Sequence, residues 1–196
     1  MHEIAFIMGK SASGKDKIYK TIIEDFGSDL KTITMYTTRP KRVGERDGVE
    51  YNFVNDEDAC EMEKNGKIIE IRKYNTVNGI WKYFTADDGQ ISLECGDRYL
   101  VIGTLEAYEK FVEFYGKEHL LPIYIEVEDE VRLIRAIKRE KRQANPNYEE
   151  VCRRFIADAS DFKEENIMRA GIKKKFDNNG KLDDCIKEIE EYLKNN

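Results

Sequence analysis

Short apolar runs alternate along the chain with longer segments in which apolar residues recur at three- and four-residue spacing. Residues 4–8 predict a buried strand, and Ile18, Ile22 and Phe26 then share one face of a helix. The longest helical stripe runs from Tyr148 to Phe162. Further strands are predicted at residues 32–36, 99–102, 123–127 and 174–176, and further helices at residues 56–65, 105–115, 130–142 and 182–193.

This order of elements predicts an α/β fold in which a parallel sheet is covered by helices on both faces. Parallel strands need crossover connections, and these are usually helical. A chain of 196 residues fits a single domain, here residues 1–196. Between residues 37 and 90 the alternation gives way to a charged stretch rich in Gly, Asn and Tyr. We therefore expect residues 37–90 to form a small inserted subdomain.

The composition is that of a globular protein with an acidic surface. Hydrophobic residues make up 40% and charged residues 37% of the chain, which argues against a disordered or membrane-spanning chain. The net charge of −6 disfavours a general nucleic-acid binder, because affinity for the phosphate backbone depends on lysine and arginine. The apolar stretch at residues 4–8 is too short for a secretory signal. We expect a cytoplasmic protein with no membrane or nucleic-acid partner.

Cysteine and histidine contribute little candidate chemistry. The four cysteines lie at least 33 positions apart and form no CxxC pair, so neither a zinc site nor a disulfide framework is predicted. The two histidines, His2 and His119, offer little basis for a histidine triad or metal centre. Reduced and mostly buried thiols are the expected state of the cysteines.

The segment directly after the first predicted strand has the G-x-x-x-x-G-K frame of a phosphate-binding loop. It reads Gly9, Lys10, Ser11, Ala12, Ser13, Gly14, Lys15, Asp16. In such a loop glycines let backbone N–H groups turn inward, and the lysine reaches the β- and γ-phosphates. The frame alone is a weak signal, and a simple tight turn is the alternative. Its position between a buried strand and an amphipathic helix favours phosphate binding, because a helix N-terminus attracts anions.

One position departs from this loop pattern. Residue 16 is Asp, where Ser or Thr would supply a hydroxyl to Mg²⁺. A carboxylate is also a hard oxygen ligand, so Asp16 is a candidate magnesium ligand, directly or through water. Alternatively, Asp16 simply occupies the first turn of a helix, where acidic residues are favoured.

A second segment brings arginines, an acid and a tyrosine close together. Residues 37–54 read TTRPKRVGERDGVEYNFV and contain Arg39, Arg42, Glu45 and Tyr51. Guanidinium groups bind phosphate through paired hydrogen bonds, and a tyrosine hydroxyl can add another. The alternative is a solvated loop of mixed charge. The segment closely resembles the TTRxxRxGExxGxxYxFV signature of the guanylate kinase family and keeps every defining position.

The resemblance to guanylate kinases extends over nearly the whole chain and implies a P-loop NTPase-type sheet. It makes residues 37–90 the monophosphate-binding subdomain and residues 132–154 the lid region. It also implies that Arg39, Arg42 and Tyr51 hold the phosphate of GMP, with Glu45 supporting them.

The resemblance further implies a site for the guanine base. Glu70 matches the family's glutamate that accepts hydrogen bonds from guanine N1–H and the 2-amino group, and a carboxylate suits two adjacent donors. An exposed acid at a strand end is the alternative. Tyr83 and Thr85 match the GMP-binding segment that follows, after an apparent insertion. Met35 stands near a position where the family often has a serine that helps to hold guanine.

A row of arginines follows the fourth strand. Arg132, Arg135, Arg139 and Arg142 fall within roughly 80° of one another on a helix, which a solvated basic face would also explain. The resemblance matches Arg135 and Arg139, together with Arg154 on the returning helix, to lid arginines that contact the transferring phosphates. It also matches Asn178 to an adenine-contacting asparagine, although Asn179 is an equal candidate.

A second departure from the family lies at the end of a buried strand. Residues 100–104 read LVIGT, where guanylate kinases normally have an aspartate near Mg²⁺ and GMP. We hypothesise that Asp16 replaces this missing charge from the side of the phosphate loop.

The residues and the resemblance together predict an ATP- and Mg²⁺-dependent kinase that phosphorylates GMP or dGMP. The candidate catalytic residues are Lys15, Arg39, Arg135, Arg139 and Arg154. A kinase with a different acceptor base is one alternative, and a non-catalytic guanylate kinase-like binding module is another. A generic GTPase is disfavoured because the chain has no NKxD-type motif. A monomer or a homodimer is expected.

Overall fold

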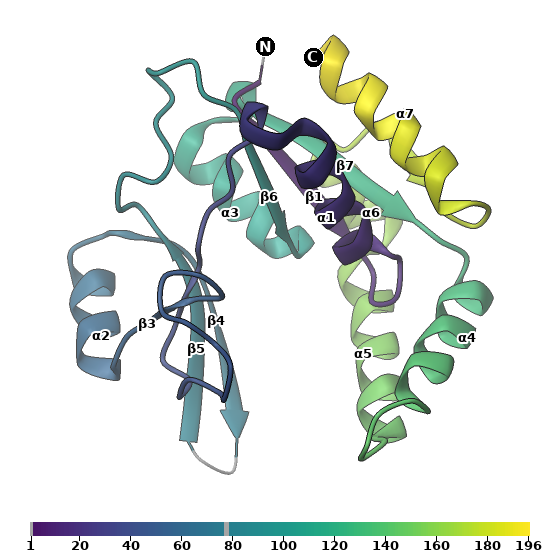
Figure 1. Ribbon diagram of the computed structural model, residues 1–196, viewed down its shortest axis with the longest axis horizontal. Coiled ribbons are helices and arrows are strands. Elements are labelled where there is room, and N and C mark those ends of the chain that lie inside the picture. Colours follow the sequence, from purple (N-terminus) through teal and green to yellow (C-terminus); the bar gives the residue numbers. More distant parts are fainter. Residues whose placement is uncertain (1, 77–78) are drawn as a thin grey trace.

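The computed structural model describes residues 2–76 and 79–196. Figure 1 shows an upper part built on a sheet, from which two arms extend downward, one on each side. The insertion predicted before Tyr83 includes residues 77 and 78, which lie outside the described residues. In the described part of the chain, no helix is long and apolar enough to cross a membrane.

The upper part contains a four-stranded parallel sheet. Its order is β6 (Tyr99–Gly103), β1 (Ile4–Gly9), β7 (Leu120–Glu126) and β8 (Lys175–Asp177), and every neighbouring pair is parallel. All six residues of β1 are buried, as expected for a central strand of a sheet covered on both faces. The predicted α/β class with a parallel sheet is confirmed.

Helices cover both faces of this sheet, and the alternating side chains of β1 show why. Phe6 packs in one core with residues of α3 (Leu105–Tyr115) and α6 (Glu164–Arg169). Ile7 packs in the opposite core with residues of α1 (Lys15–Phe26) and α7 (Leu182–Asn195). Successive residues of a strand point to opposite faces, so a continuous apolar run serves two cores at once.

One arm is a second four-stranded sheet. Its order is β3 (Asn52–Phe53), β2 (Tyr36–Thr37), β5 (Gly79–Ala86) and β4 (Ile68–Thr76), and helix α2 (Asp56–Lys64) packs against it. A small core of Ala59, Phe84 and Ala86 joins helix to sheet. This arm therefore has its own apolar centre, separate from the two cores of the parallel sheet.

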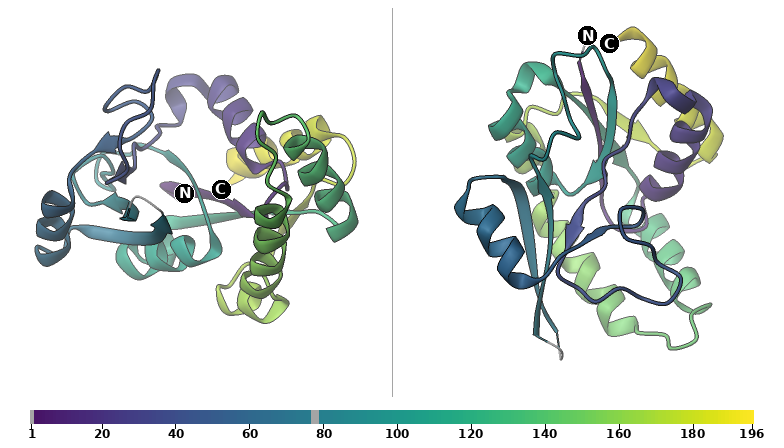
Figure 2. Two further views of the ribbon diagram at one scale, coloured as in Figure 1. Left: turned by 90° about the horizontal axis from the view of Figure 1, so that it is seen from below. Right: turned by 60° about the vertical axis from the view of Figure 1, so that its left-hand side comes forward.

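The other arm is a pair of helices, α4 (Asp129–Glu140) and α5 (Tyr148–Asp161), joined by a loop at residues 141–147. Figures 1 and 2 show this pair across from the second sheet. The chain ends meet on the opposite side of the molecule, where the His2 N–H donates to the Asn196 carbonyl at 3.1 Å. Short 3₁₀ helices, η1 (Gly27–Asp29) and η2 (Lys117–His119), follow α1 and α3.

The strand predicted at residues 32–36 is mostly wrong. Only Tyr36–Thr37 form a strand, because the backbone of Thr34 bonds to a side chain instead of a neighbouring strand. The Thr34 N–H donates to Gln90 Oε1 at 2.7 Å, and the Thr34 carbonyl accepts from Gln90 Nε2 at 3.2 Å. Apolar periodicity cannot reveal such a side-chain partner.

Candidate active site

A cavity of about 770 Å³ lies where the parallel sheet and the two arms meet. The phosphate-binding loop and the end of β6 line its floor. The second sheet lines one wall and helix α5 the other. Its lining consists of Ser11, Lys15, Asp16, Met35, Tyr51, Arg72, Tyr74, Trp81, Tyr83, Ile102, Gly103, Thr104, Glu150, Arg153, Arg154, Ala157, Asp158 and Asp161.

The loop between β1 and α1 has the tight path that its glycines permit. Gly14 adopts φ +92°, and a Cβ on it would lie 2.6 Å from Asn178 Nδ2. A Cβ on Gly9 would lie 2.8 Å from the Ile125 carbonyl oxygen, so a side chain there would meet backbone, whereas one at Gly14 would have to displace the Asn178 side chain. Ala12 is also left-handed, at φ 63°. Alternating left-handed residues turn N–H groups inward, which is the geometry of an anion-binding nest.

Lys15 and Asp16 open helix α1 and both line the cavity. The positive end of the helix and the Lys15 ammonium favour an anion at this point. The Asp16 carboxylate is exposed beside them. Among the described residues no group of three or more His, Cys, Asp or Glu side chains gathers to hold a metal. Asp16 alone still suits Mg²⁺, which commonly takes one or two carboxylates and completes its shell with phosphate oxygens and water.

A carboxylate that the sequence did not single out contacts the phosphate loop. Asp158 of α5 accepts from the Ser11 backbone N–H at 2.8 Å through Oδ2. The same oxygen lies 3.3 Å from Nη1 of Arg132, whose side chain is only 1% exposed. Arg132 also bonds Asp129 at 2.7 Å and lies over the Phe155 ring at 3.8 Å. Asp158 and Arg132 thus tie helices α4 and α5 to the phosphate loop.

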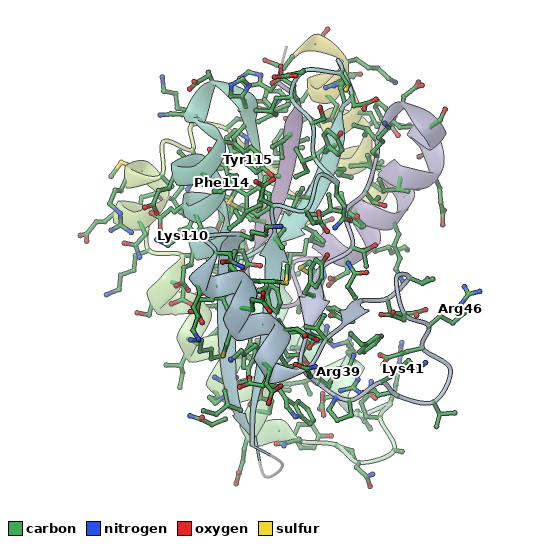
Figure 3. The ribbon with its side chains drawn as sticks, turned by 90° about the vertical axis from the view of Figure 1, so that its left-hand side faces the viewer. Arg39, Lys41, Arg46, Lys110, Phe114 and Tyr115 are labelled. Atoms are coloured by element: carbon green, nitrogen blue, oxygen red, sulfur yellow. The ribbon has the colours of Figure 1, made fainter. Side chains whose placement is uncertain are left out.

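Arg39 and Glu45 form a paired cluster on the second sheet. Arg39 is buried and donates through Nη1 and Nη2 to the two carboxylate oxygens of Glu45, at 2.8 and 2.9 Å. The Arg42 N–H donates to the same carboxylate at 2.7 Å. The Arg39 guanidinium lies 5.4 Å from the ring centre of Tyr51. Figure 3 shows Arg39 at the base of its loop, whereas Arg46 projects outward.

This pairing shifts the ionisation of both groups. The hydrogen bonds from Arg39 are the main reason that the pKa of Glu45 falls from 4.5 to about 2. The pKa of Arg39 is raised by the same contact and, to a smaller extent, by Tyr83. Arg39 therefore stays fully charged, and its Nε is buried without a partner among the described residues. A buried cation with a free donor beside a cavity is suited to an anionic ligand.

Glu70 and Thr85 are cross-strand neighbours on β4 and β5, and both are buried. The Thr85 hydroxyl donates to Glu70 Oε1 at 3.1 Å. Arg72, two residues further along β4, donates through Nε and Nη2 to the two oxygens of Glu70, both at 3.1 Å. Glu70 is therefore not an exposed strand-end acid, and its partner Arg72 is part of the cavity lining.

The arginines on the helical arm fall into different environments. Arg132 is buried, so the predicted row is not a uniform solvated face. Arg135 donates to the Asn178 carbonyl at 2.9 Å, and Arg139 is exposed. Arg154 lines the cavity and is bonded to Glu150 at 2.6 Å. Arg153, bonded to the same carboxylate at 2.7 Å, also lines the cavity and was not predicted.

Asn178 lies behind the phosphate loop. Its side chain is buried and donates through Nδ2 to the Ser13 carbonyl at 2.7 Å. Asn179 holds the neighbouring turn, because its Oδ1 accepts from the Glu128 N–H at 2.8 Å. Neither residue lines the cavity.

The end of β6 forms the part of the floor where an acid is missing. Ile102, Gly103 and Thr104 line the cavity there. The Thr104 hydroxyl accepts from the Ala107 N–H at 3.2 Å and so caps helix α3. Asp16 at the start of α1 and Asp158, which accepts from the Ser11 N–H, are carboxylates on the phosphate-loop side of this floor.

The predicted site residues divide by position. Those on the cavity surface are Ser11, Lys15, Asp16, Tyr51, Tyr83 and Arg154. Those that support the lining residues through contacts or loop geometry are Gly9, Ser13, Gly14, Arg39, Glu45, Glu70 and Thr85. Lys10, which bonds Asp129, and Ala12, Arg42, Arg135, Arg139 and Asn178 lie outside the lining. The charged lining residues that the sequence did not indicate are Arg72, Glu150, Arg153, Asp158 and Asp161.

Comparisons with known proteins agree with the signature. A sequence model of the guanylate kinase family matches residues 2–80. The guanylate kinase of Mycoplasma mobile is 26% identical over 98% of this chain and 92% of its own length. That of Oceanobacillus iheyensis is 33% identical over 56% of this chain and 54% of its own length. The crystal structure of guanylate kinase from Anaplasma phagocytophilum shares the fold, with a TM-score of 0.58 and 21% identity over 98% of this chain and 85% of that chain.

Proposed function

We propose that this chain, which is related to the guanylate kinases, transfers the γ-phosphoryl group of ATP to GMP or dGMP. The products are ADP and the corresponding guanosine diphosphate. One observation carries the proposal: a single cavity joins the phosphate-binding loop to the Arg39–Tyr51 side of the second sheet. Two phosphate-binding elements that share one cavity suit a reaction between two phosphorylated substrates.

Two groups of residues would hold the substrates. The loop amides and Lys15 bind the phosphates of ATP, where the N-terminus of α1 adds positive potential. Arg39, Arg42 and Tyr51 bind the phosphate of the acceptor, and Glu45 keeps Arg39 charged and oriented. Glu70 and Thr85, together with Tyr83, face the acceptor nucleotide from the second sheet.

Catalysis in this scheme comes from alignment and charge neutralisation. Phosphoryl transfer needs little covalent help from the protein, and a phosphate oxygen of GMP is already a competent nucleophile. Arg154 lies on the cavity wall and stabilises charge on the transferring group. Arg135 and Arg139 reach that group only after helix α4 moves inward. No general base is required.

Asp16 is the residue we propose to hold Mg²⁺, together with phosphate oxygens of ATP and water. When bound, the ion supplies positive charge to the phosphates and spares Asp16 from repelling them. The contribution of the chain is an exposed carboxylate fixed in the first turn of α1, next to Lys15. This placement is consistent with Asp16 taking over the charge that the end of β6 lacks.

The two arms are proposed to close on the bound substrates. Residues 37–90 would act as the monophosphate-binding subdomain and residues 132–154 as the lid. Closure would exclude water that otherwise hydrolyses ATP. We further propose that the enzyme works in the cytoplasm as a monomer or homodimer, which cell fractionation and light scattering would test.

The test is a panel of acceptors. ADP formation from ATP is measured with GMP, dGMP, AMP, CMP and UMP in separate reactions, with and without Mg²⁺. We expect turnover with GMP and dGMP alone and loss of turnover without the metal. Turnover with another nucleotide would overturn GMP as the proposed acceptor. Binding of GMP without turnover would favour a non-catalytic binding module.

A further inference from the structure

The acceptor-base end of the cavity contains an arginine next to the predicted base-reading glutamate. The Arg72 guanidinium donates to both oxygens of Glu70 at 3.1 Å. Its Nη2 also lies 3.4 Å from Met35 Sδ. Glu70 is 5% exposed and Arg72 is half-buried, so the pair is held within the protein with one side on the cavity.

The pair retains unused hydrogen-bonding capacity. Arg72 Nη1 carries two N–H groups and has no partner in the part of the chain that the structure describes. Glu70 Oε1 accepts from both Thr85 and Arg72, whereas Oε2 accepts from Arg72 alone. A carboxylate oxygen has two lone pairs, so Oε2 can accept one more donor. Among the described residues, the pair thus keeps a free donor group on Arg72 and a free acceptor lone pair on Glu70.

The pair is also close enough to the phosphate cluster to contact the same nucleotide. Arg72 and Tyr83 are cross-strand partners on β4 and β5. The Tyr83 ring lies 5.7 Å from that of Tyr51, which is next to Arg39. Tyr83 therefore connects the base end of the site to the end that would bind the acceptor phosphate.

Resting on the proposed function, we propose that Arg72 determines specificity for the acceptor base by donating hydrogen bonds to guanine O6. Guanine presents the acceptor O6 beside the donor N1–H, which matches Arg72 beside Glu70. Arginine pairing with guanine O6 and N7 is the commonest specific arginine–base contact. Adenine presents an amino donor where guanine has O6, and an unprotonated N1 acceptor where guanine has N1–H. Arg72 would then face a donor and Glu70 would face an acceptor, so neither hydrogen bond would form.

This role also explains a departure in the chain. Met35 stands near where the resemblance expects a serine that helps to hold guanine, and its thioether is only a weak acceptor. Because Arg72 Nη2 contacts the Met35 sulfur, the guanidinium lies close to residue 35, where the expected serine would carry its hydroxyl. Arg72 supplies the donor that residue 35 lacks.

The test compares GMP with 6-thio-GMP, in which sulfur replaces O6 and accepts hydrogen bonds weakly. We expect the wild-type protein to prefer GMP, with a lower KM. Arg72→Met should raise the KM for GMP by roughly 10- to 100-fold and bring its preference over 6-thio-GMP towards one. Arg72→Lys should be intermediate, since it keeps a charge and a donor but not the planar fork.

The matched control is Lys73→Met. Lys73 is the next residue of β4, and its ammonium is 3.5 Å from Glu63 on α2, away from the cavity lining. It should keep the wild-type preference. An unchanged preference in Arg72→Met would overturn the inference; should that variant fail to fold, an unchanged preference in Arg72→Lys would do so.

Failure of the proposed function would be recognised separately. If the wild-type protein phosphorylates no GMP, the affinities of the wild-type protein and Arg72→Met for GMP and 6-thio-GMP are measured by calorimetry. This measurement tests the role of Arg72 in base recognition independently of turnover. A preference for GMP that disappears in Arg72→Met would support the inference. Equal binding of the two nucleotides by the wild-type protein would contradict it.

Discussion

Single arginines in this protein serve different purposes that depend on what surrounds each side chain. Arg132 is buried under Phe155 and joins Asp129 to Asp158, so it stabilises the helical arm. Arg39 is equally buried, but its Nε has no partner among the described residues and its neighbours face the cavity. Arg132 has its donors satisfied within the protein, whereas in the described structure Arg39 keeps a buried donor free, which fits the proposed phosphate-binding role of Arg39.

Lys15 gives the most direct test of the phosphate loop at the residue scale. Lys15→Met should lower kcat by roughly 10²- to 10³-fold, because a fixed positive charge at the transferring group is lost. Lys17→Met, on the exposed side of the same helix turn, removes the same charge and should keep near wild-type turnover. Steady-state kinetics on both variants provides the measurement. Equal effects of the two substitutions would refute a specific role for Lys15.

The lowered pKa of Glu45 predicts that the stability of the protein depends on pH. Its pKa is lowered from 4.5 to about 2, chiefly by Arg39, so the folded state favours the charged carboxylate. The stabilisation is present above pH 4.5 and is lost as the pH falls towards 2. Urea unfolding of the wild-type protein and Glu45→Gln should therefore differ at pH 6 and converge in acid.

The control for this measurement is Glu94→Gln, an exposed acid for which the described structure shows no ion pair. It should unfold like the wild-type protein at pH 6. A difference between wild type and Glu45→Gln that persists unchanged to pH 3 would show that the Arg39 pairing is not its cause.

Sequence reasoning could propose individual residues for the site more readily than the partners that they contact. The spacing of Arg39, Glu45 and Tyr51 within one segment predicted that they act together, and the structure brings them into contact. The contact of Asp158 with the Ser11 N–H joins residues 147 positions apart. Arg72 is two residues from Glu70 on β4, so strand alternation places both on one face, but the pairing of the two side chains is seen only in the structure. The Asp158 contact leaves no periodic or motif signal.

At the scale of elements, the site depends on the junction between β1 and α1. Gly14 ends the loop and precedes the first helical residue, and Asn178 packs directly against it. The loop from β8 thereby holds the phosphate loop in place through the bond from Asn178 to Ser13. The start of helix α1 and the proposed anion site are thus built from the same residues.

Gly14→Ala tests this junction. The substitution combines a strained left-handed backbone with a Cβ 2.6 Å from Asn178 Nδ2. Gly96→Ala is the matched control, because Gly96 has φ +72° but nothing within 4 Å of a Cβ. We expect Gly96→Ala to cost about 1 kcal/mol and Gly14→Ala about 1–2 kcal/mol more, together with weaker ATP binding. Similar costs in chemical denaturation would contradict the close packing of Asn178.

Elements with strong periodicity were the most predictable. The helix predicted at residues 105–115 matches α3, and the stripe from Tyr148 to Phe162 matches α5 almost to the residue. The order of strands within the sheet could not be obtained this way, since β1 lies between β6 and β7 although its first residue, Ile4, is 95 positions from Tyr99 and 116 from Leu120. Strand order depends on long-range packing that local patterns do not record.

At the scale of the whole molecule, one cavity is shared by three parts of the fold. The parallel sheet provides the phosphate loop, and the two arms provide the walls (Figure 1). We expect a two-nucleotide analogue, adenosine and guanosine linked by a phosphate chain, to reduce the radius of gyration in small-angle scattering. A non-hydrolysable ATP analogue alone should reduce it less, because only one arm is engaged. An unchanged radius with the linked analogue would contradict closure.

Transfer of labelled phosphate from [γ-³²P]ATP in the presence of GMP and Mg²⁺ tests the proposed reaction most directly. The label should move into GDP, and little should appear as inorganic phosphate, because closure of the two arms excludes water. Label found only as inorganic phosphate, or retained entirely in ATP while GMP is bound, would contradict a GMP kinase.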